Sequence, residues 1–175
     1  MPKTKPFKPQ KIYLFDNINY SVAENVIRSI HEANNDTEVD KIELIICSGG
    51  GFLALSFAIY DTIINSQKPI NTLATGYCGS SAVMILQAGK KRFATKNTKF
   101  FIHPSEMSLD TNEPYRSYLN ITEDYKQNHA KFMELSSQKT GYSPEEFEKL
   151  ATPSKYLSPE EALEFGKNGL IDEIV

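Results

Sequence analysis

The chain has 175 residues, 40% hydrophobic and 23% charged, which is the composition of a globular protein of about one domain. Its net charge of −3 argues against a nucleic-acid surface, and no apolar run approaches the ~18 residues of a membrane span. Cys47 and Cys78 both lie in apolar segments, and the three histidines stand far apart, so neither a disulfide framework nor a metal site is expected. The sequence predicts a reduced, cytoplasmic protein with no cofactor and no nucleic-acid or membrane partner.

Residues 1–10 (MPKTKPFKPQ) hold three prolines and three lysines and are expected to form a flexible basic leader. An acidic partner would suit this charge, but a solvated tail is the simpler interpretation. Residues 11–175 are expected to form a single domain. Within it, a polar stretch at about 108–140 has helical periodicity and is expected to project as a handle.

The chain after the leader alternates between strand-like and helix-like segments. Strands are expected at 11–15, 41–48, 70–75, 91–95, 99–103 and 170–175, the third stopping before Gly76. Helices are expected at 21–36, 52–66, 82–88 and about 113–139, followed by two short ones. Three capping boxes start helices: Ser21-x-x-Glu24, Ser143-x-x-Glu146 and Ser158-x-x-Glu161. This alternation, with Gly-rich turns, predicts an α/β fold with a mainly parallel sheet.

Three glycines, Gly49, Gly50 and Gly51, separate the second strand from its helix. Consecutive glycines allow positive φ and leave backbone N–H groups open to a ligand. A phosphate loop would end in Gly-Lys-Ser/Thr, which is missing here, whereas an oxyanion hole needs only free amides. A tight turn with no ligand explains the same residues, so the glycines alone leave the alternatives open.

Ser80 and Ser81 open the apolar helical run at 82–88. Serine is a common helix cap, and capping alone would explain one hydroxyl. The run is apolar on every face, however, so its N-terminus lies at the end of a buried element. A nucleophile at such a place can be held rigidly against backbone donors.

His103 ends an expected buried strand and precedes Pro104. Taken alone, it is as consistent with a hydrogen-bonded structural residue as with a general base. Strand ends near Gly-rich turns are where open α/β sheets place their sites, and a neutral imidazole near a serine is the usual means of activating it. His31 and His129 lie in polar helical stretches and are expected on the surface.

Four blocks of the sequence, in chain order, match the motifs of one known family. CSGGGFLALSFAIYDTI resembles N-S-P-G-G with an I-Y-D-T helix, and GYCGSSAVMILQAGKKRF resembles G-x-A-A-S-M-G-A-x-L-L-x-A-G with a K-R-F strand. KFFIHPSE resembles R-V-M-I-H-Q-P, and YLSPEEALEFGKNGLIDEI resembles F-M-S-A-x-E-A-x-x-Y-G-L-I-D. The family is the proteolytic subunit of the Clp protease, a serine peptidase. The resemblance implies a ClpP/crotonase-like spiral of β-β-α units, with a mainly parallel sheet and a projecting long helix.

The same resemblance implies roles for individual residues. Ser80 would be the nucleophile and His103 the general base. Gly51 and Ser81 would supply backbone N–H groups to an oxyanion hole, with Gly50 beside them. The substrate would be an unfolded or flexible polypeptide, and the chain would form a homo-oligomeric ring that pairs with an ATP-dependent unfoldase.

Three departures from the family pattern bear on these roles. The family's third triad member is an Asp, and Ser154 stands there, without the charge that stabilises an imidazolium. Asp110, Glu113 and Asp124 are candidate substitutes. Gly49 replaces the Pro of S-P-G-G, which loosens the oxyanion loop. The unfoldase-docking N-terminal segment is shorter, and PSEMSLDTNEPY replaces the strand that joins facing rings, so unfoldase pairing and ring stacking stay open.

These observations leave competing functions. The leading hypothesis is a serine endopeptidase of the Clp type, or a relative such as a phage-type maturation protease. The second is a catalytically impaired subunit with a structural or regulatory role in an oligomer, which Ser154 favours. A crotonase-like acyl-CoA enzyme would use a similar oxyanion hole, but the Ser80–His103 pairing would then have no purpose. A pure binding module is the remaining alternative.

Overall fold

The fold is built on one seven-stranded sheet, seen in a computed structural model that describes residues 9–105 and 115–175. The strands are β1 (Gln10–Phe15), β2 (Ile42–Ser48), β3 (Ile70–Gly79), β4 (Arg92–Ala94), β5 (Lys99–Ile102), β6 (Lys155–Leu157) and β7 (Glu173–Ile174). Their order is β1-β2-β3-β4-β7, and β5 pairs with the far end of β3. All pairs are parallel except β5 with β6. The predicted α/β fold with a mainly parallel sheet is therefore confirmed.

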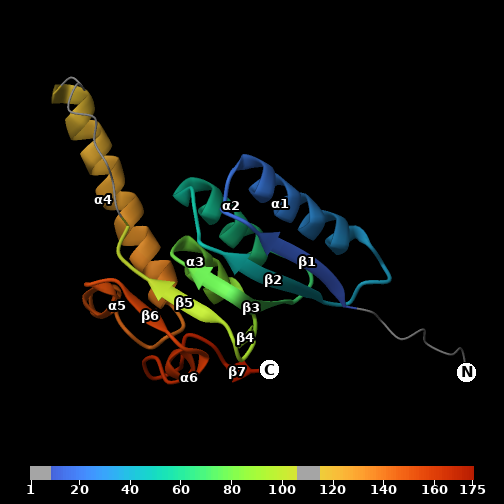
Figure 1. Cartoon of the computed structure of the whole chain (residues 1–175). Helices are drawn as coiled ribbons and strands as arrows, with labels where there is room; N and C mark the ends of the chain where they lie inside the picture. Colours follow the sequence, from blue (N-terminus) through green and yellow to red (C-terminus); the bar gives the residue numbers. More distant parts are fainter. Residues whose placement is uncertain (1–8, 106–114) are drawn as a thin grey trace, which may run out of the picture.

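Six helices connect and cover the strands in the described part of the chain (Figure 1). They are α1 (Tyr20–Asn35), α2 (Leu53–Ile64), α3 (Ser81–Ala88), α4 (Tyr115–Ser137), α5 (Pro144–Ala151) and α6 (Pro159–Leu163). Helix α3 packs against α2, α4 and β3, and all eight of its residues are buried. This central position explains why its sequence is apolar on every face.

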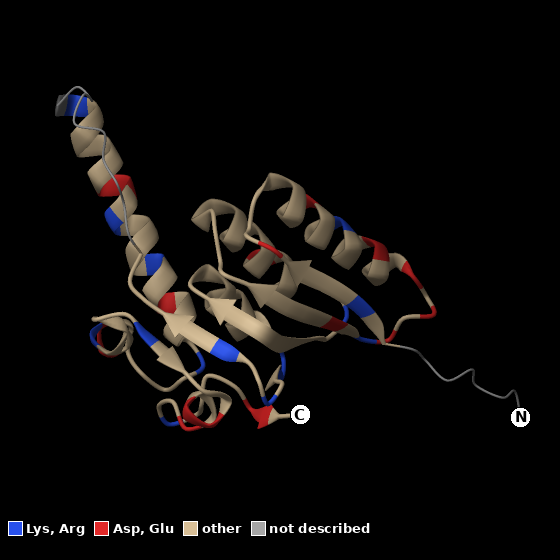
Figure 2. Cartoon of the chain, in the orientation of Figure 1, with Lys and Arg blue, Asp and Glu red and all other residues tan. Residues whose placement is uncertain are grey.

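Helix α4 projects from the body of the molecule, and both signs of charge appear along it (Figures 1 and 2). It covers most of the stretch expected as a handle, but residues 108–114 of that stretch lie outside the described residues. So do residues 1–8 of the expected leader; β1 begins at Gln10. No helix within 9–105 and 115–175 is long and apolar enough to cross a bilayer.

Two expected boundaries are wrong. Helix α1 begins at Tyr20, because the side chain of Asn19 accepts a hydrogen bond from the Val22 amide and caps the helix, where Ser21 was expected to do so. Strand β3 does not stop at Gly76 but continues to Gly79, because β5 pairs with its last three residues. The capping boxes that start α5 and α6 are both confirmed, with each reciprocal hydrogen bond in place.

The C-terminal segment is fastened to the sheet by the buried side chain of Arg92. Its guanidinium donates hydrogen bonds to the carboxylate of Asp172 and to the carbonyl oxygens of Asn168 and Gly169. It also binds the side-chain oxygen of Gln87 on α3 at 2.8 Å. A buried cation is tolerated only when its donors are satisfied in this way, so this network holds β7 beside β4.

This network predicts an acid-sensitive contribution to stability. Burial raises the pKa of Asp172, but hydrogen bonds from Arg92 and its charge outweigh that effect and leave the pKa below its ordinary value. The carboxylate therefore stabilises the fold above the pKa of unfolded Asp, ~3.9, and this contribution is lost as pH falls through the folded pKa. We expect Asp172→Asn to lower the free energy of unfolding by roughly 1.5–3 kcal/mol at pH 7. Urea titrations of the wild type and variant should converge on acidification; a constant gap would contradict this.

Candidate active site

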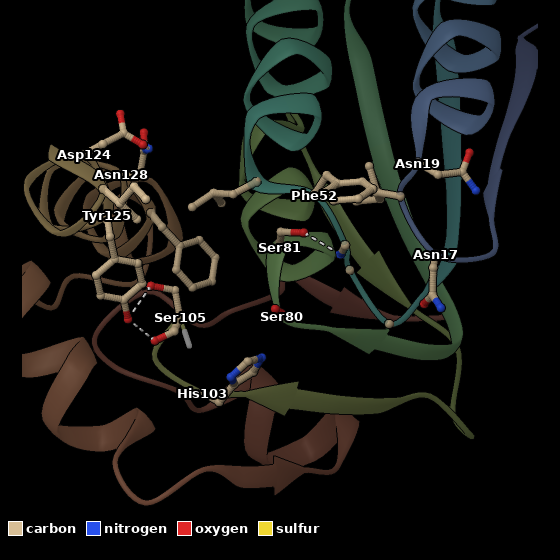
Figure 3. Close-up of a pocket in the computed structure, with 17 residues that line it drawn as sticks. Asn17, Asn19, Phe52, Ser80, Ser81, His103, Ser105, Asp124, Tyr125 and Asn128 are labelled. Carbon is tan, nitrogen blue, oxygen red and sulfur yellow. Dashed lines mark hydrogen bonds between the residues drawn. The ribbon is translucent and has the colours of Figure 1, made fainter. Parts of the chain in front are cut away.

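A cavity of about 730 Å³ opens where β2, β3 and β5 end (Figure 3). One wall is the glycine loop that follows β2, and a second is the N-terminus of α3. Residues 103–105 and one face of α4 complete it. The structure thus brings together Gly50, Gly51, Ser80, Ser81 and His103, which are far apart in the sequence.

Ser80 stands on a strained turn between β3 and α3. Its backbone has φ 53° and ψ −129°, and its side chain makes no capping hydrogen bond to α3. A non-glycine residue at positive φ costs of the order of 1–3 kcal/mol, and such strain is concentrated at functional sites. Because the hydroxyl lines the cavity and does not cap the helix, capping does not explain this serine.

His103 immediately follows β5 and lines the same cavity. Its ring stacks on Phe101 with 5.0 Å between ring centroids. The Phe101 carbonyl accepts a hydrogen bond of 2.9 Å from the Ser80 amide, which ties the two candidate residues through the backbone. Within the described part of the chain, no hydrogen bond joins the Ser80 hydroxyl to the imidazole. Catalytic hydrogen bonds are often long before substrate binds, so this geometry still allows a hydrogen bond between Ser80 and His103 to form in the complex with substrate.

Ser154 immediately precedes β6, and His103 immediately follows β5. Strands β5 and β6 pair Phe101 with Tyr156 and Ile102 with Lys155, and one further step of this antiparallel register would align His103 with Ser154. Opposed residues of an antiparallel pair point to the same face, so an acidic side chain at 154 would face the imidazole. The Ser154 residue itself is exposed.

Asp124, the substitute acid that falls within the described residues, is not found beside His103. Asp124 lines the cavity from α4, where it accepts a hydrogen bond of 2.8 Å from Asn128, and Figure 3 shows it on the opposite side of the cavity from His103. Asp110 and Glu113 lie outside the described residues. The orienting group of the imidazole therefore stays unassigned.

The amides of the glycine loop already have acceptors. The Gly50 amide donates to the Ser48 hydroxyl and the Gly51 amide to the Ser81 hydroxyl, each at 3.1 Å. The Ser81 amide is the first of α3 and has no acceptor within the helix. A substrate oxygen could bind the Gly51 amide only by displacing the Ser81 hydroxyl.

The glycines are required by close packing. A Cβ on Gly50 would lie 2.8 Å from the Ser80 Cβ, and one on Gly51 would lie 2.3 Å from the Ile18 carbonyl oxygen. The Ile18 amide donates a hydrogen bond of 2.8 Å to the Gly50 carbonyl oxygen. The Ile18 carbonyl oxygen accepts one of 3.0 Å from the Phe52 amide. The loop is therefore held rigidly against the turn that carries Ser80.

The α4 wall of the cavity was not anticipated. Ile121, Tyr125, Asn128 and Phe132 recur at helical spacing and face the cavity. This periodicity is visible in the sequence, but a helix expected to project gave no reason to place it there. His129 on the same helix was expected on the surface, and this is wrong: its side chain is only 18% exposed and hydrogen-bonded at both nitrogens.

The fold is that of a ClpP-type protein. A solved mutant of ClpP1 from Listeria monocytogenes superposes with a TM-score of 0.81 at 24% sequence identity, over 95% of this chain and 91% of that one. The family model described as Clp protease matches residues 3–175. The chain therefore belongs to the Clp protease family, and its resemblance to that family is confirmed.

Proposed function

We propose that the protein is a serine endopeptidase that cleaves unfolded or flexible polypeptides, with a degenerate third triad position. The observation that carries this proposal is the conformation of Ser80, which is strained, uncapped and directed into a cavity shared with His103. Family membership supports protease chemistry in general. The shared cavity supports the roles of the individual residues.

In the proposed mechanism the Ser80 Oγ attacks the scissile carbonyl carbon while His103 accepts its proton. The Ser81 amide, joined by that of Gly51, stabilises the oxyanion, and Gly50 keeps the loop close to the turn. His103 then protonates the departing amine, and water hydrolyses the acyl-enzyme by the same steps in reverse. Ser154 would orient the imidazole weakly, through a neutral hydroxyl.

A fluorophosphonate probe tests this proposal directly. We expect an adduct on the peptide that contains Ser80, with loss of that adduct in His103→Ala. Intact and peptide mass spectrometry measure both. Absence of a Ser80 adduct on the folded wild-type protein would overturn the proposal.

A catalytically impaired subunit with a structural or regulatory role in an oligomer is the second candidate. Two observations favour it: Ser154 stands at the acid position, and the Ser81 hydroxyl accepts the hydrogen bond that the Gly51 amide would donate to an oxyanion. An unlabelled Ser80 in a protein that assembles normally would select this alternative.

The Ser81 hydroxyl provides a prediction about the oxyanion hole. In Ser81→Ala the Gly51 amide becomes free, and we expect kcat for peptide hydrolysis to rise by about 10²-fold, the usual worth of one oxyanion donor. The change removes the acceptor of a hydrogen bond from the Ser56 hydroxyl. The fold should tolerate this, because the Ser56 hydroxyl can donate to the Phe52 carbonyl oxygen at 2.9 Å.

The matched control for this change is Ser56→Ala, which removes the neighbouring hydroxyl and keeps the Ser81–Gly51 hydrogen bond. Its turnover should equal that of the wild type. Equal turnover in Ser81→Ala would show that the Gly51 amide is not an oxyanion donor.

We further propose that 11–175 act as one peptidase domain that assembles into a homo-oligomeric ring in the cytoplasm, with α4 as its projecting handle. That helix exposes the apolar side chains of Tyr118, Leu119 and Ile121. Their exposure supports assembly, because a neighbouring subunit would cover them. An ATP-dependent unfoldase partner belongs to the same proposal. The mass of the protein in solution tests assembly, and a monomer would contradict it.

A further inference from the structure

A second serine, histidine and carboxylate are joined in a hydrogen-bonded chain outside the proposed Ser80 site. The Ser105 hydroxyl lies 2.7 Å from Nδ1 of His129 on α4. Nε2 of the same ring lies 2.9 Å from the Glu148 carboxylate on α5. Ser105 lies in the KFFIHPSE block, His129 and Glu148 belong to no motif of the sequence, and the proposed peptidase mechanism uses none of the three.

The Glu148 carboxylate fixes the direction of these hydrogen bonds. An ionised carboxylate only accepts, so the nitrogen that faces it, Nε2, must carry the ring proton. In the neutral ring Nδ1 is then an acceptor, and the Ser105 O–H donates to it. This is the arrangement that activates a nucleophile: a hydroxyl bound to a base whose far nitrogen is held by a third group. The ring nitrogens are used in the order opposite to that of the usual triad, and either can act as the base.

A donor and a binding space also lie at Ser105. The Ser105 hydroxyl also lies 3.3 Å from the Tyr125 hydroxyl, to which it can donate as an alternative to His129, and the Tyr125 hydroxyl at present donates to the Ser105 carbonyl oxygen. The hydrogen of the Tyr125 hydroxyl rotates freely, so it can turn to an oxyanion that forms beside the Ser105 Oγ. Ser105 and Tyr125 both line the cavity that holds Ser80, and Figure 3 shows them on its α4 side. A bound carbonyl compound would therefore reach Ser105.

We propose that Ser105 is a second nucleophilic serine, which accepts acyl groups from small activated esters bound in the cavity. Its Oγ forms a bond to the carbonyl carbon while its proton passes to Nδ1 of His129. The ester C–O bond then breaks, and the alcohol or phenol leaves with that proton. Water attacks the acyl-Ser105 with His129 again as base, which releases the carboxylic acid and restores the serine. The site works independently of Ser80 and His103.

The test uses the full-length Ser80→Ala protein, in which the first serine is absent. We expect a fluorophosphonate probe to form an O–P bond to Ser105 with loss of fluoride, and p-nitrophenyl acetate to release p-nitrophenol. Peptide mass spectrometry locates the adduct. A general base contributes typically 10²–10⁴-fold, so Ser80→Ala/His129→Gln should label at least about 10²-fold more slowly.

Two further variants separate nucleophilic activation from simple packing. Ser80→Ala/Glu148→Gln keeps a hydrogen-bonding side chain on α5 but removes the charge, and we expect it to label more slowly than the parent while unfolding at a similar temperature. Ser80→Ala/Ser105→Ala should lose both label and esterase activity. No Ser105 adduct in Ser80→Ala would overturn the proposal, as would labelling that is unchanged by the His129 and Glu148 substitutions. If the His129 and Glu148 substitutions lowered stability without slowing the labelling, the hydrogen bonds among Ser105, His129 and Glu148 would serve only to tie α4 to α5.

Discussion

Replacing Ser80 with alanine is expected to lower kcat for peptide hydrolysis by about 10²-fold, because loss of the nucleophile costs a complete triad about 10⁶-fold and the missing acid accounts for up to about 10⁴-fold of that already. The fold should be unaffected, because the Ser80 hydroxyl does not cap α3 and alanine occupies the same backbone conformation. Initial rates on an unstructured fluorogenic peptide measure the loss. Circular dichroism and thermal unfolding check that the structure is retained.

Ser21→Ala is the matched control, since Ser21 is an exposed serine in the first turn of α1 and does not line the cavity. It should turn over peptide as the wild type does. Ser80→Gly adds a second test, because glycine tolerates φ 53° without strain. We expect this variant to be inactive yet more stable than the wild type. Retained peptidase activity in both Ser80 variants would remove this serine from the mechanism.

The parts of the fold that could be predicted depend on local contacts. The capping boxes at Ser143 and Ser158 were confirmed because both partners lie within one helical turn. The alternation of strands and helices was sufficient for the α/β fold. The start of α1 was wrong because Asn19, just before the expected cap, offers an equally good acceptor.

The rest depends on contacts between distant segments. Strand β3 continues past Gly76 only because β5 pairs with it, a partner that a glycine in the sequence does not reveal. His129 looked like a surface residue of a polar helix, yet its partners are 24 and 19 residues away. In the candidate site, sequence motifs could nominate Ser81 and Gly51, but not the hydrogen bond that joins them across 30 residues.

Introducing a carboxylate opposite His103 is the second large effect that we expect. Ser154→Asp should raise kcat for peptide hydrolysis, by up to about 10⁴-fold, because an ionised acid fixes the imidazole tautomer and stabilises the imidazolium that forms as Ser80 attacks. Continued one residue past the Ile102–Lys155 pair, the strand register would align residue 154 with His103, on the same face as Tyr156, whose ring packs 4.7 Å from that of Phe101. Because Ser154 is exposed, the new charge carries little desolvation cost.

Two controls isolate the charge at this position. Ser154→Asn has the size and hydrogen-bonding capacity of the aspartate without its charge, and we expect it to leave kcat near the wild-type value. Thr152→Asp places the same charge two residues earlier, on another exposed residue, and should also have little effect. Measuring kcat and KM for the wild type and the three variants tests whether the charge at residue 154 orients His103, since an orienting acid changes kcat and leaves KM nearly constant. Equal turnover in Ser154→Asp and Ser154→Asn would show that residue 154 does not act on His103.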